Sequence, residues 1–334
     1  MDISVERRVS MERHLTSMGM IHHRVRGNPW QQIYIPNDLL TFWTTAWCKS
    51  QTGENITSHS EVLKNTSSHL RKYTSIMSGL CGRGKDKFGK EKNTLKELGC
   101  TTSHLLAMHR AIYSNSSSRY AIIVEDDVKF PFDVDYELLT QSAPEGFGIL
   151  QLFNSNKHTM TFTWTNYLKN KDRLWYLSEN LMYWSTCGYL IDRVVMKPIV
   201  DQLVYHKDGW QHFKVIAGIS GPCAPPECCS NGTESRWGYY GKFDKKAPCV
   251  LASFGFQADS FLYSLAPTYM LGIPLIANGK GGDASTFHQD HVESLHRAAF
   301  RKQRQIINEL LLGKVSLPSF AKPACQLALN ESQI

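Results

Sequence analysis

The segment Tyr120-Ala121-Ile122-Ile123-Val124-Glu125-Asp126-Asp127-Val128 decides our interpretation of this chain. Its first five residues form an apolar run of strand length. Such a run is typical of a strand inside a sheet that helices cover on both faces. Three acidic residues follow the run directly. Because open α/β sheets bind ligands beyond the carboxyl ends of their strands, the segment predicts a functional site where this strand ends.

The acidic triplet Glu125, Asp126 and Asp127 has no cation between its members. Adjacent carboxylates repel one another, and partial burial makes the repulsion stronger. A divalent cation such as Mn²⁺ or Mg²⁺ would relieve it, because these ions take oxygen ligands and can bridge phosphate oxygens. The bound ion could then neutralise a diphosphate leaving group. The alternative is a solvated acidic turn without a ligand.

Strands and helices alternate along the rest of the chain. Apolar runs predict further strands, and helical spacing of apolar residues predicts helices. The expected strands are 147–153 and 188–191, and the expected helices are 5–20, 101–113, 192–206 and 295–312. We expect Thr102 or Ser103 to cap the second helix. Gly19 and Gly313 stand where the first and the last helix should end. The alternation predicts an α/β sandwich with a mostly parallel central sheet flanked by helices.

The chain has 334 residues, and we interpret residues 1–313 as one domain and 314–334 as a tail. An irregular insertion rich in cysteine, proline and glycine interrupts the domain at about 221–249. The composition, 42% hydrophobic and 20% charged, is globular and excludes collagen, coiled coil and wholesale disorder. The net charge of +7 is too small on this length to indicate nucleic-acid binding.

Two features of the sequence favour a secretory compartment. The chain has nine cysteines, of which four lie in the insertion, and five Asn-x-Ser/Thr sequons. The sequons begin at Asn55, Asn65, Asn115, Asn231 and Asn330. However, no apolar run approaches the ~20 residues that span a bilayer, and no signal segment opens the chain. We therefore expect the lumen of the ER or Golgi if the N-terminus is truncated, and the cytoplasm otherwise.

The block Leu98-Gly99-Cys100-Thr101-Thr102-Ser103-His104, the helix after it and the segment 120–128 together resemble the signature of glycosyltransferase family 25. This family includes lipopolysaccharide-type and collagen-type galactosyltransferases. Its signature is a Gly-Cys-x-x-Ser-His block, a helix of about this length and an apolar strand that ends in Glu-Asp-Asp. Further similarity extends over most of residues 1–290, at 2–19, 185–191, 258–263 and 269–276.

The resemblance implies a GT-A-like nucleotide-binding sandwich, a UDP-sugar donor and Mn²⁺ or Mg²⁺ as the cofactor. By the same likeness Asp127, with Glu125 or Asp126, forms the site for the metal and the donor diphosphate. We assign Asp126 and Asp127 as metal ligands and Glu125 as a contact to the diphosphate. Ser103 and His104 would lie near the donor at a helix start, where backbone N–H groups favour anionic oxygen. The alternative for His104 is a capping or core histidine.

Three basic residues could also contact the donor. Arg7 and Arg8 could bind phosphate bidentately, or they could form a solvated helix face. The implied fold often adds a late histidine near the donor phosphates, and we assign His288 to this place as a metal ligand. The alternative is a surface histidine, since His291 and His296 lie close to it in the sequence. No third ligand at a specific spacing supports zinc.

The family is understood to invert the sugar carbon, which needs a carboxylate to take the proton of the acceptor hydroxyl. Asp259 is our candidate for this base, because it is alone in an apolar stretch where burial would favour proton uptake. Its alternative role is the N-cap of the segment that follows. Asp283 is the second candidate for the base.

The family opens with a strand that leads into the first helix, whereas Met1-Asp2 stands where that strand should end. We therefore expect that the first strand is missing, because of a truncated gene model or a loss of activity. The predicted function is a metal-dependent hexosyltransferase (EC 2.4) that moves galactose or glucose from a UDP-sugar to a hydroxyl of a glycan or glycoprotein, with inversion. Nucleic acid is not an expected partner, and membrane contact would need the absent anchor. The alternatives are an inactive carbohydrate-binding or scaffold protein of the same fold, and a metal-dependent phosphoester hydrolase.

Overall fold

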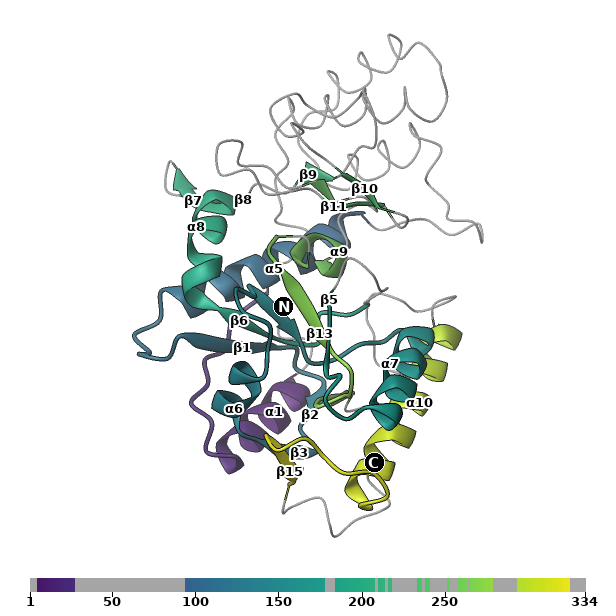
Figure 1. The fold of residues 1–334 in the computed structure, drawn as a ribbon. Coiled ribbons are helices and arrows are strands. Elements are labelled where there is room, and N and C mark those ends of the chain that lie inside the picture. The colour runs from purple at the N-terminus through teal and green to yellow at the C-terminus, as the bar shows by residue number, and fades with distance from the viewer. Residues whose placement is uncertain are drawn as a thin grey trace. The chain divides into compact units, whose positions relative to one another are not determined.

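The computed structural model describes residues 5–27, 94–177, 184–207, 210–213, 216–217, 233–235, 238–240, 251–252, 258–263, 265–278 and 293–324. The chain forms two compact units. The first unit comprises Val25–Arg110 and Pro198–Leu265. The second unit comprises Asp2–Arg24, Ala111–Lys197 and Ala266–Ile334, and it holds the acidic triplet (Figure 1).

The second unit is built on a five-stranded sheet of order β1-β6-β4-β13-β5. Its strands are β1 (Tyr120–Val124), β4 (Ile149–Gln151), β5 (Trp175–Leu177), β6 (Gly188–Asp192) and β13 (Thr268–Leu271). Of the four pairs in this described sheet, β4–β13 is parallel and the other three are antiparallel. The predicted α/β class is confirmed, but the prediction of a mostly parallel sheet is wrong. An apolar run shows that a strand is buried on both faces, but it does not show the direction of the strand.

Both faces of the middle strands are buried, as the apolar runs predicted. Leu150 and Leu190 belong to the main hydrophobic cluster of the unit. Ile149, Tyr189 and Ile191 point to the opposite face, because successive side chains of a strand alternate, and they are also buried. The described middle strands are therefore buried on both faces.

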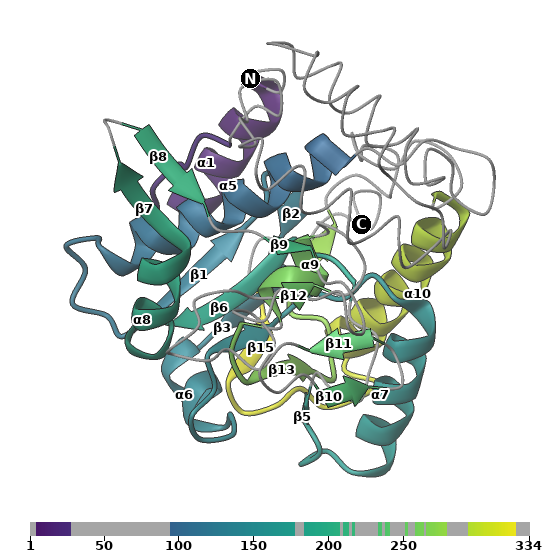
Figure 2. The same ribbon diagram turned by 90° about the horizontal axis from the view of Figure 1, so that it is seen from above.

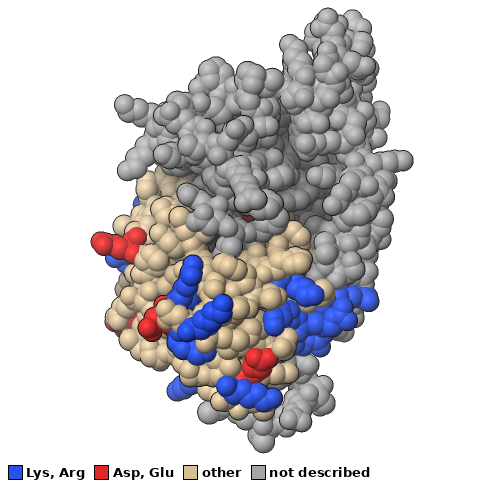
Figure 3. Space-filling view, turned by 45° about the vertical axis from the view of Figure 1, so that its right-hand side comes forward, with Lys and Arg blue, Asp and Glu red and all other residues tan. Residues whose placement is uncertain are grey.

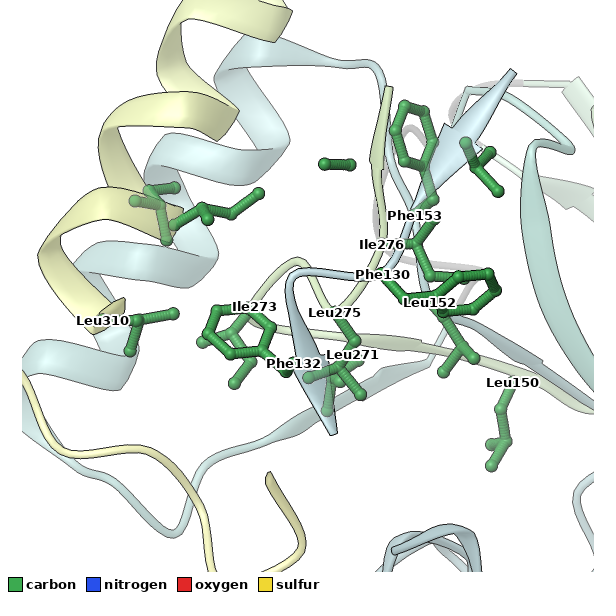
Figure 4. Close-up of a cluster of buried hydrophobic side chains, with 14 of the residues drawn as sticks. Phe130, Phe132, Leu150, Leu152, Phe153, Leu271, Ile273, Leu275, Ile276 and Leu310 are labelled. Atoms are coloured by element: carbon green, nitrogen blue, oxygen red, sulfur yellow. The ribbon is translucent and has the colours of Figure 1, made fainter. Parts of the chain in front are cut away.

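The main hydrophobic cluster joins the sheet to four helices. These are α1 (Val5–Ser17), α6 (Tyr136–Gln141), α7 (Lys157–Lys169) and α10 (Glu293–Leu311). Figure 2 shows α7 and α10 side by side, as does Figure 1, and the two helices pack against each other. Figure 4 shows Phe132 gathered with Leu271, Ile273 and Leu275, and Phe130 beside Leu152. Because full burial of such a side chain contributes about 1.5–3 kcal/mol, this cluster is a main source of stability.

Two pairs of short strands also belong to the second unit. In the second unit, β2 (Val128–Lys129) pairs with β14 (Ala277–Asn278), and β3 (Phe132–Val134) pairs with β15 (Ala321–Pro323). Helix α8 (Arg193–Leu203) follows β6 and contains Pro198.

The first unit has a four-stranded sheet, a hairpin and a short helix. The elements are β7 (Val204–Lys207), β8 (Trp210–Phe213), β9 (Ile216–Ala217), β10 (Thr233–Ser235), β11 (Gly238–Tyr240), β12 (Leu251–Ala252) and α9 (Ala258–Leu262). The sheet order is β10-β11-β12-β9, and β7 pairs with β8. The predicted irregular insertion at 221–249 therefore includes two regular strands. Its four cysteines lie outside the described residues.

The helix before β1 begins earlier than predicted. Helix α5 spans Thr94–Ile112, so Thr102 and Ser103 lie inside it and not at its N-cap. Both hydroxyl groups donate to the backbone oxygen of Gly99. Serine and threonine make this local bond in helix interiors, whereas the oxygen of an N-cap side chain accepts from backbone N–H groups. The N-cap prediction is wrong because the helix continues through Gly99.

Two helices end at glycine, as predicted. Gly19 after α1 has a φ of +69°, and Gly313 after α10 has a φ of +66°. Glycine adopts this left-handed conformation without the steric cost of a Cβ atom. After α1, the N–H of Met20 donates to the oxygen of Leu15 at 3.0 Å, which satisfies a carbonyl of the last helical turn.

The described surface carries more basic than acidic side chains in the view of Figure 3, in keeping with the net charge of +7. Among the described residues, no helix combines the length and the apolar character that a membrane crossing requires.

His14 links α1 to the segment after the acidic triplet. Its Nε2 accepts a hydrogen bond from the N–H of Phe130 at 3.3 Å, and the two rings stack with centroids 5.7 Å apart. Burial, together with the charge of Lys129, lowers the pKa of His14 below its ordinary value of 6.5. The folded chain therefore favours the neutral imidazole, which can accept this bond.

Acidification should destabilise the protein through His14. The unfolded chain takes up the proton near pH 6.5 and the folded chain does so at lower pH. Neutral His14 therefore contributes fully to the free energy of unfolding above pH 6.5. This contribution is lost as the pH falls through the pKa of the folded chain. The free energy of unfolding in urea should fall less in His14→Gln than in the wild type between about pH 7.5 and pH 5.5. His158→Gln, at an exposed position, should behave like the wild type. Equal falls in all three proteins would contradict the prediction.

Candidate metal centre

The acidic triplet lies at one edge of the five-stranded sheet, directly beyond β1. Because β1 and β6 are antiparallel and Val124 pairs with Gly188, the end of β1 meets the start of β6. The triplet therefore faces the turn Ser185–Cys187, which leads into β6. Strands β4 and β13 run in the same direction as β1, so they also end at this edge. The site lies at the expected end of the strand, although the sheet is mixed.

Two hydrogen bonds fix Glu125 to this turn. The backbone N–H of Glu125 donates to the backbone oxygen of Cys187 at 2.9 Å. The hydroxyl of Thr186 donates to the carboxylate Oε1 of Glu125 at 2.8 Å. Thr186 is only 5% exposed, so this bond is shielded from water. Glu125 is thus held by both its backbone and its side chain.

Glu125, Asp127 and Cys187 bring three potential ligand atoms together. One carboxylate oxygen of each acid and the Sγ atom of Cys187 all lie within 4.8 Å of one another. Each residue is half-buried, and the Oδ1 atom of Asp127 is buried. Ligands on opposite sides of one divalent cation lie about 4.2–4.6 Å apart, so small side-chain movements would let all three reach one ion. The residues present therefore fit a divalent cation.

The turn that carries Cys187 has an unusual backbone. Ser185 has a φ of +88°, which is rare for a residue other than glycine. Its hydroxyl oxygen accepts a bond from the N–H of Cys187 at 3.1 Å. The fully buried Gln151 at the end of β4 donates through Nε2 to the backbone oxygens of Trp184 and Ser185, at 3.3 and 3.1 Å. These bonds stabilise the strained conformation that brings Cys187 to the two acids.

A comparison with known families gave a match. Residues 83–208 match the family model of glycosyltransferase family 25 (LPS biosynthesis protein). The match confirms the resemblance seen in the sequence, over a shorter range than residues 1–290. The comparisons with curated proteins and with solved structures gave no match.

The family-25 segment contains all three members of the metal group. A glycosyltransferase segment indicates a transferase of EC class 2.4 and implies a sugar donor and an acceptor. The metal group at the end of β1 thus lies inside the segment that the family model matches.

The structure divides the acidic triplet of the family-25 segment into two kinds of residue. Asp126, predicted as a metal ligand, is exposed and is not a member of the metal group. Glu125, predicted as a diphosphate contact, is a member together with the predicted ligand Asp127. The sequence interpretation did not include Cys187 among the ligands. Cys187 could have been predicted only by assuming that the strands at 120–124 and 188–191 are antiparallel neighbours, as they are in the structure.

Ser103 and His104 of the family-25 segment lie in the interior of α5. The argument that they stand at a helix N-terminus is therefore wrong, because α5 begins at Thr94. Ser103 is half-buried, and its hydroxyl bonds within the helix. His104 is only 7% exposed. A contact of either residue with the donor stays a prediction.

The remaining candidate residues are placed in part. Arg8 is half-buried in α1, and the side chain of Arg7 lies outside the described residues. Asp259 is half-buried in the first turn of α9, where its backbone oxygen accepts a bond from Tyr263 at 3.1 Å. The alternative of Asp259 as an N-cap is wrong, because α9 begins at Ala258. His288 and the second candidate base, Asp283, lie outside the described residues.

Proposed function

We propose that this chain is a metal-dependent hexosyltransferase that moves galactose or glucose from a UDP-sugar to a hydroxyl group of a glycan or glycoprotein. The observation that carries the proposal is the group of Glu125, Asp127 and Cys187 inside the segment that matches family 25. The implied fold is the GT-A-like sandwich, in which a cation and a nucleotide diphosphate share one sheet edge.

A bound Mn²⁺ or Mg²⁺ would supply positive charge to the diphosphate leaving group. Glu125 and Asp127 would hold this ion by carboxylate oxygens. Thr186 orients Glu125 through the bond to Oε1, and the backbone bond from Glu125 to Cys187 keeps both strands in register. Such prior orientation matters because preorganised charge needs no rearrangement as the reaction proceeds.

The proposed transfer is a single displacement with inversion. A base takes the proton of the acceptor hydroxyl as its oxygen forms a bond to the anomeric carbon of the sugar. The bond from that carbon to the phosphate oxygen breaks, and UDP leaves with the electron pair. Asp259 is our candidate for the base. Arg7, Arg8, Ser103, His104 and His288 are the candidates for contacts to the donor.

We also propose that the protein works in a secretory lumen. Asn115 supports this, because it starts a sequon and is exposed in the turn between α5 and β1. An exposed turn can carry a glycan without disturbing the core.

Nucleotide binding tests the proposed function directly. UDP at a concentration about 100 times its dissociation constant should stabilise the folded chain by about 2.7 kcal/mol in the presence of Mn²⁺, and this should raise Tm. The same UDP with EDTA should give little shift, and ADP with Mn²⁺ should give less than UDP. Release of UDP from UDP-galactose or UDP-glucose would then identify the sugar. Glycan binding without a metal-dependent UDP shift would indicate a scaffold, and phosphate release would indicate a hydrolase.

A further inference from the structure

We propose that Cys187 is the third protein ligand of the cation at Glu125 and Asp127, and that its sulfur makes the site prefer thiophilic divalent ions over Mg²⁺. This inference rests on the proposed function, because it assumes that the family-25 segment holds a cation at the end of β1. It adds a ligand that the acidic motif does not contain and a metal preference that follows from this ligand.

The position of Cys187 relative to the acids carries the argument. Its Sγ atom lies within 4.8 Å of a carboxylate oxygen of both Glu125 and Asp127. The backbone at Cys187 is fixed on two sides, by the bond from Glu125 N–H to its oxygen and by the bond from its own N–H to Ser185. Sulfur and oxygen ligands bind zinc-like ions at about 2.3 Å and 2.0–2.2 Å. The group can therefore close on one ion with limited movement of side chains.

The chemistry of the three ligands sets the expected preference. Carboxylate oxygens suit Mg²⁺, Ca²⁺ and Mn²⁺, whereas a thiolate selects softer ions such as Zn²⁺ and Cd²⁺. A site with two carboxylates and one thiolate should bind Cd²⁺ and Zn²⁺ most tightly, Mn²⁺ next and Mg²⁺ least. Mn²⁺ can satisfy both ligand types, so it agrees with the cofactor of the proposed function.

Cadmium provides a direct spectroscopic test on the full chain, because a thiolate bound to Cd²⁺ gives an ultraviolet charge-transfer band. Addition of Cd²⁺ to metal-free protein should produce this band. In Cys187→Ser, the absorbance that the wild type gains with the first molar equivalent of Cd²⁺ should be lost. We expect Cys187→Ser to lower the ratio of Cd²⁺ to Mg²⁺ affinity by about tenfold or more. Cys100→Ser is the matched control, since Cys100 is also half-buried and lies outside the metal group.

Alkylation of the unmodified protein gives a second readout that needs no cysteine variant. Iodoacetamide labels accessible thiols, and mass spectrometry of peptides separates Cys187 from Cys100. Saturating Cd²⁺ should slow the labelling of Cys187 by about tenfold or more and leave Cys100 unchanged. Asp127→Asn should weaken this protection, because it removes a ligand from the same ion.

The outcomes separate this inference from the proposed function. An unchanged ion preference in Cys187→Ser, with no metal protection of the Cys187 thiol, would overturn the inference even if Mn²⁺-dependent UDP binding persists. Absence of any divalent-ion effect on Cys187 labelling and on UDP binding would overturn both. If Cys187→Ser does not fold, the labelling of the wild-type chain decides alone.

Discussion

Replacement of Asp127 by asparagine should lower the rate of sugar transfer from the UDP-donor by about 100-fold or more, because preorganised charge at a leaving group contributes on this scale. The substitution keeps the size of the side chain and removes its negative charge. Asp127 is half-buried beside Glu125 and Cys187, so the loss falls on the group that would hold the cation. The fold should persist, since the change adds no bulk.

The rate of UDP release and the Mn²⁺ concentration needed for half-maximal activity are the quantities to measure. Glu145→Gln, which changes an exposed acid of the same unit, should match the wild type. Asp126→Asn should reduce the rate much less than Asp127→Asn, because Asp126 is exposed and stands outside the metal group. Equal losses of rate in Asp126→Asn and Asp127→Asn would indicate that Asp126 is also a metal ligand. Full activity of Asp127→Asn would contradict the proposed mechanism.

Local patterns in the sequence were sufficient to predict the strand before the site and the ends of two helices. The run Tyr120–Val124 forms β1, and the glycines at 19 and 313 end their helices with positive φ. In each case the information lies within a few residues, as apolar periodicity or as the conformational freedom of glycine. The position of the site beyond β1 followed from the same local reasoning.

Strand direction could not be predicted in this way. The residues of β1 and β6 are apolar on both faces, and such runs occur in parallel and antiparallel strands alike. Direction depends on the path between strands, which includes β5 (Trp175–Leu177), a strand that the sequence interpretation did not expect. Three of the four pairs in the described sheet are antiparallel.

The direction of β6 relative to β1 also decides which residues belong to the metal group. In a parallel arrangement, the start of the strand at Gly188 would lie at the opposite edge from Glu125. The antiparallel register pairs Val124 with Gly188 and so brings Thr186 and Cys187 to the acids. The sequence predicted Asp127 as a metal ligand and Glu125 as a contact to the diphosphate, and without the strand order it could not predict that Cys187 lies beside them.

Arg193 is a structural residue that no sequence pattern indicated. Its guanidinium donates to four backbone oxygens through Nη1 and Nη2, at distances of 2.6–2.9 Å. The acceptors are Ile112, Ser114, Ser116 and Ser118, which belong to the end of α5 and the turn before β1. One side chain at the start of α8 thus holds the segment that leads into the strand of the candidate site. A planar group with five donors in fixed positions suits this task, and an ammonium group does not.

Replacement of Arg193 by methionine should destabilise the protein by about 2–4 kcal/mol. Hydrogen bonds to charged groups contribute about 1.5–3 kcal/mol each, and water can replace part of this at the exposed serine oxygens. Urea unfolding measures the loss, and hydrogen exchange at residues 113–119 should become faster. Arg193→Lys should retain less than half of the stability that Arg193→Met loses, because lysine keeps the charge but lacks the planar set of N–H donors. Arg173→Met, at an exposed arginine that lies over Tyr176, should cost less than about 1 kcal/mol. A loss in Arg193→Met as small as that control would show that the four bonds contribute little, and full recovery by lysine would show that charge matters more than geometry.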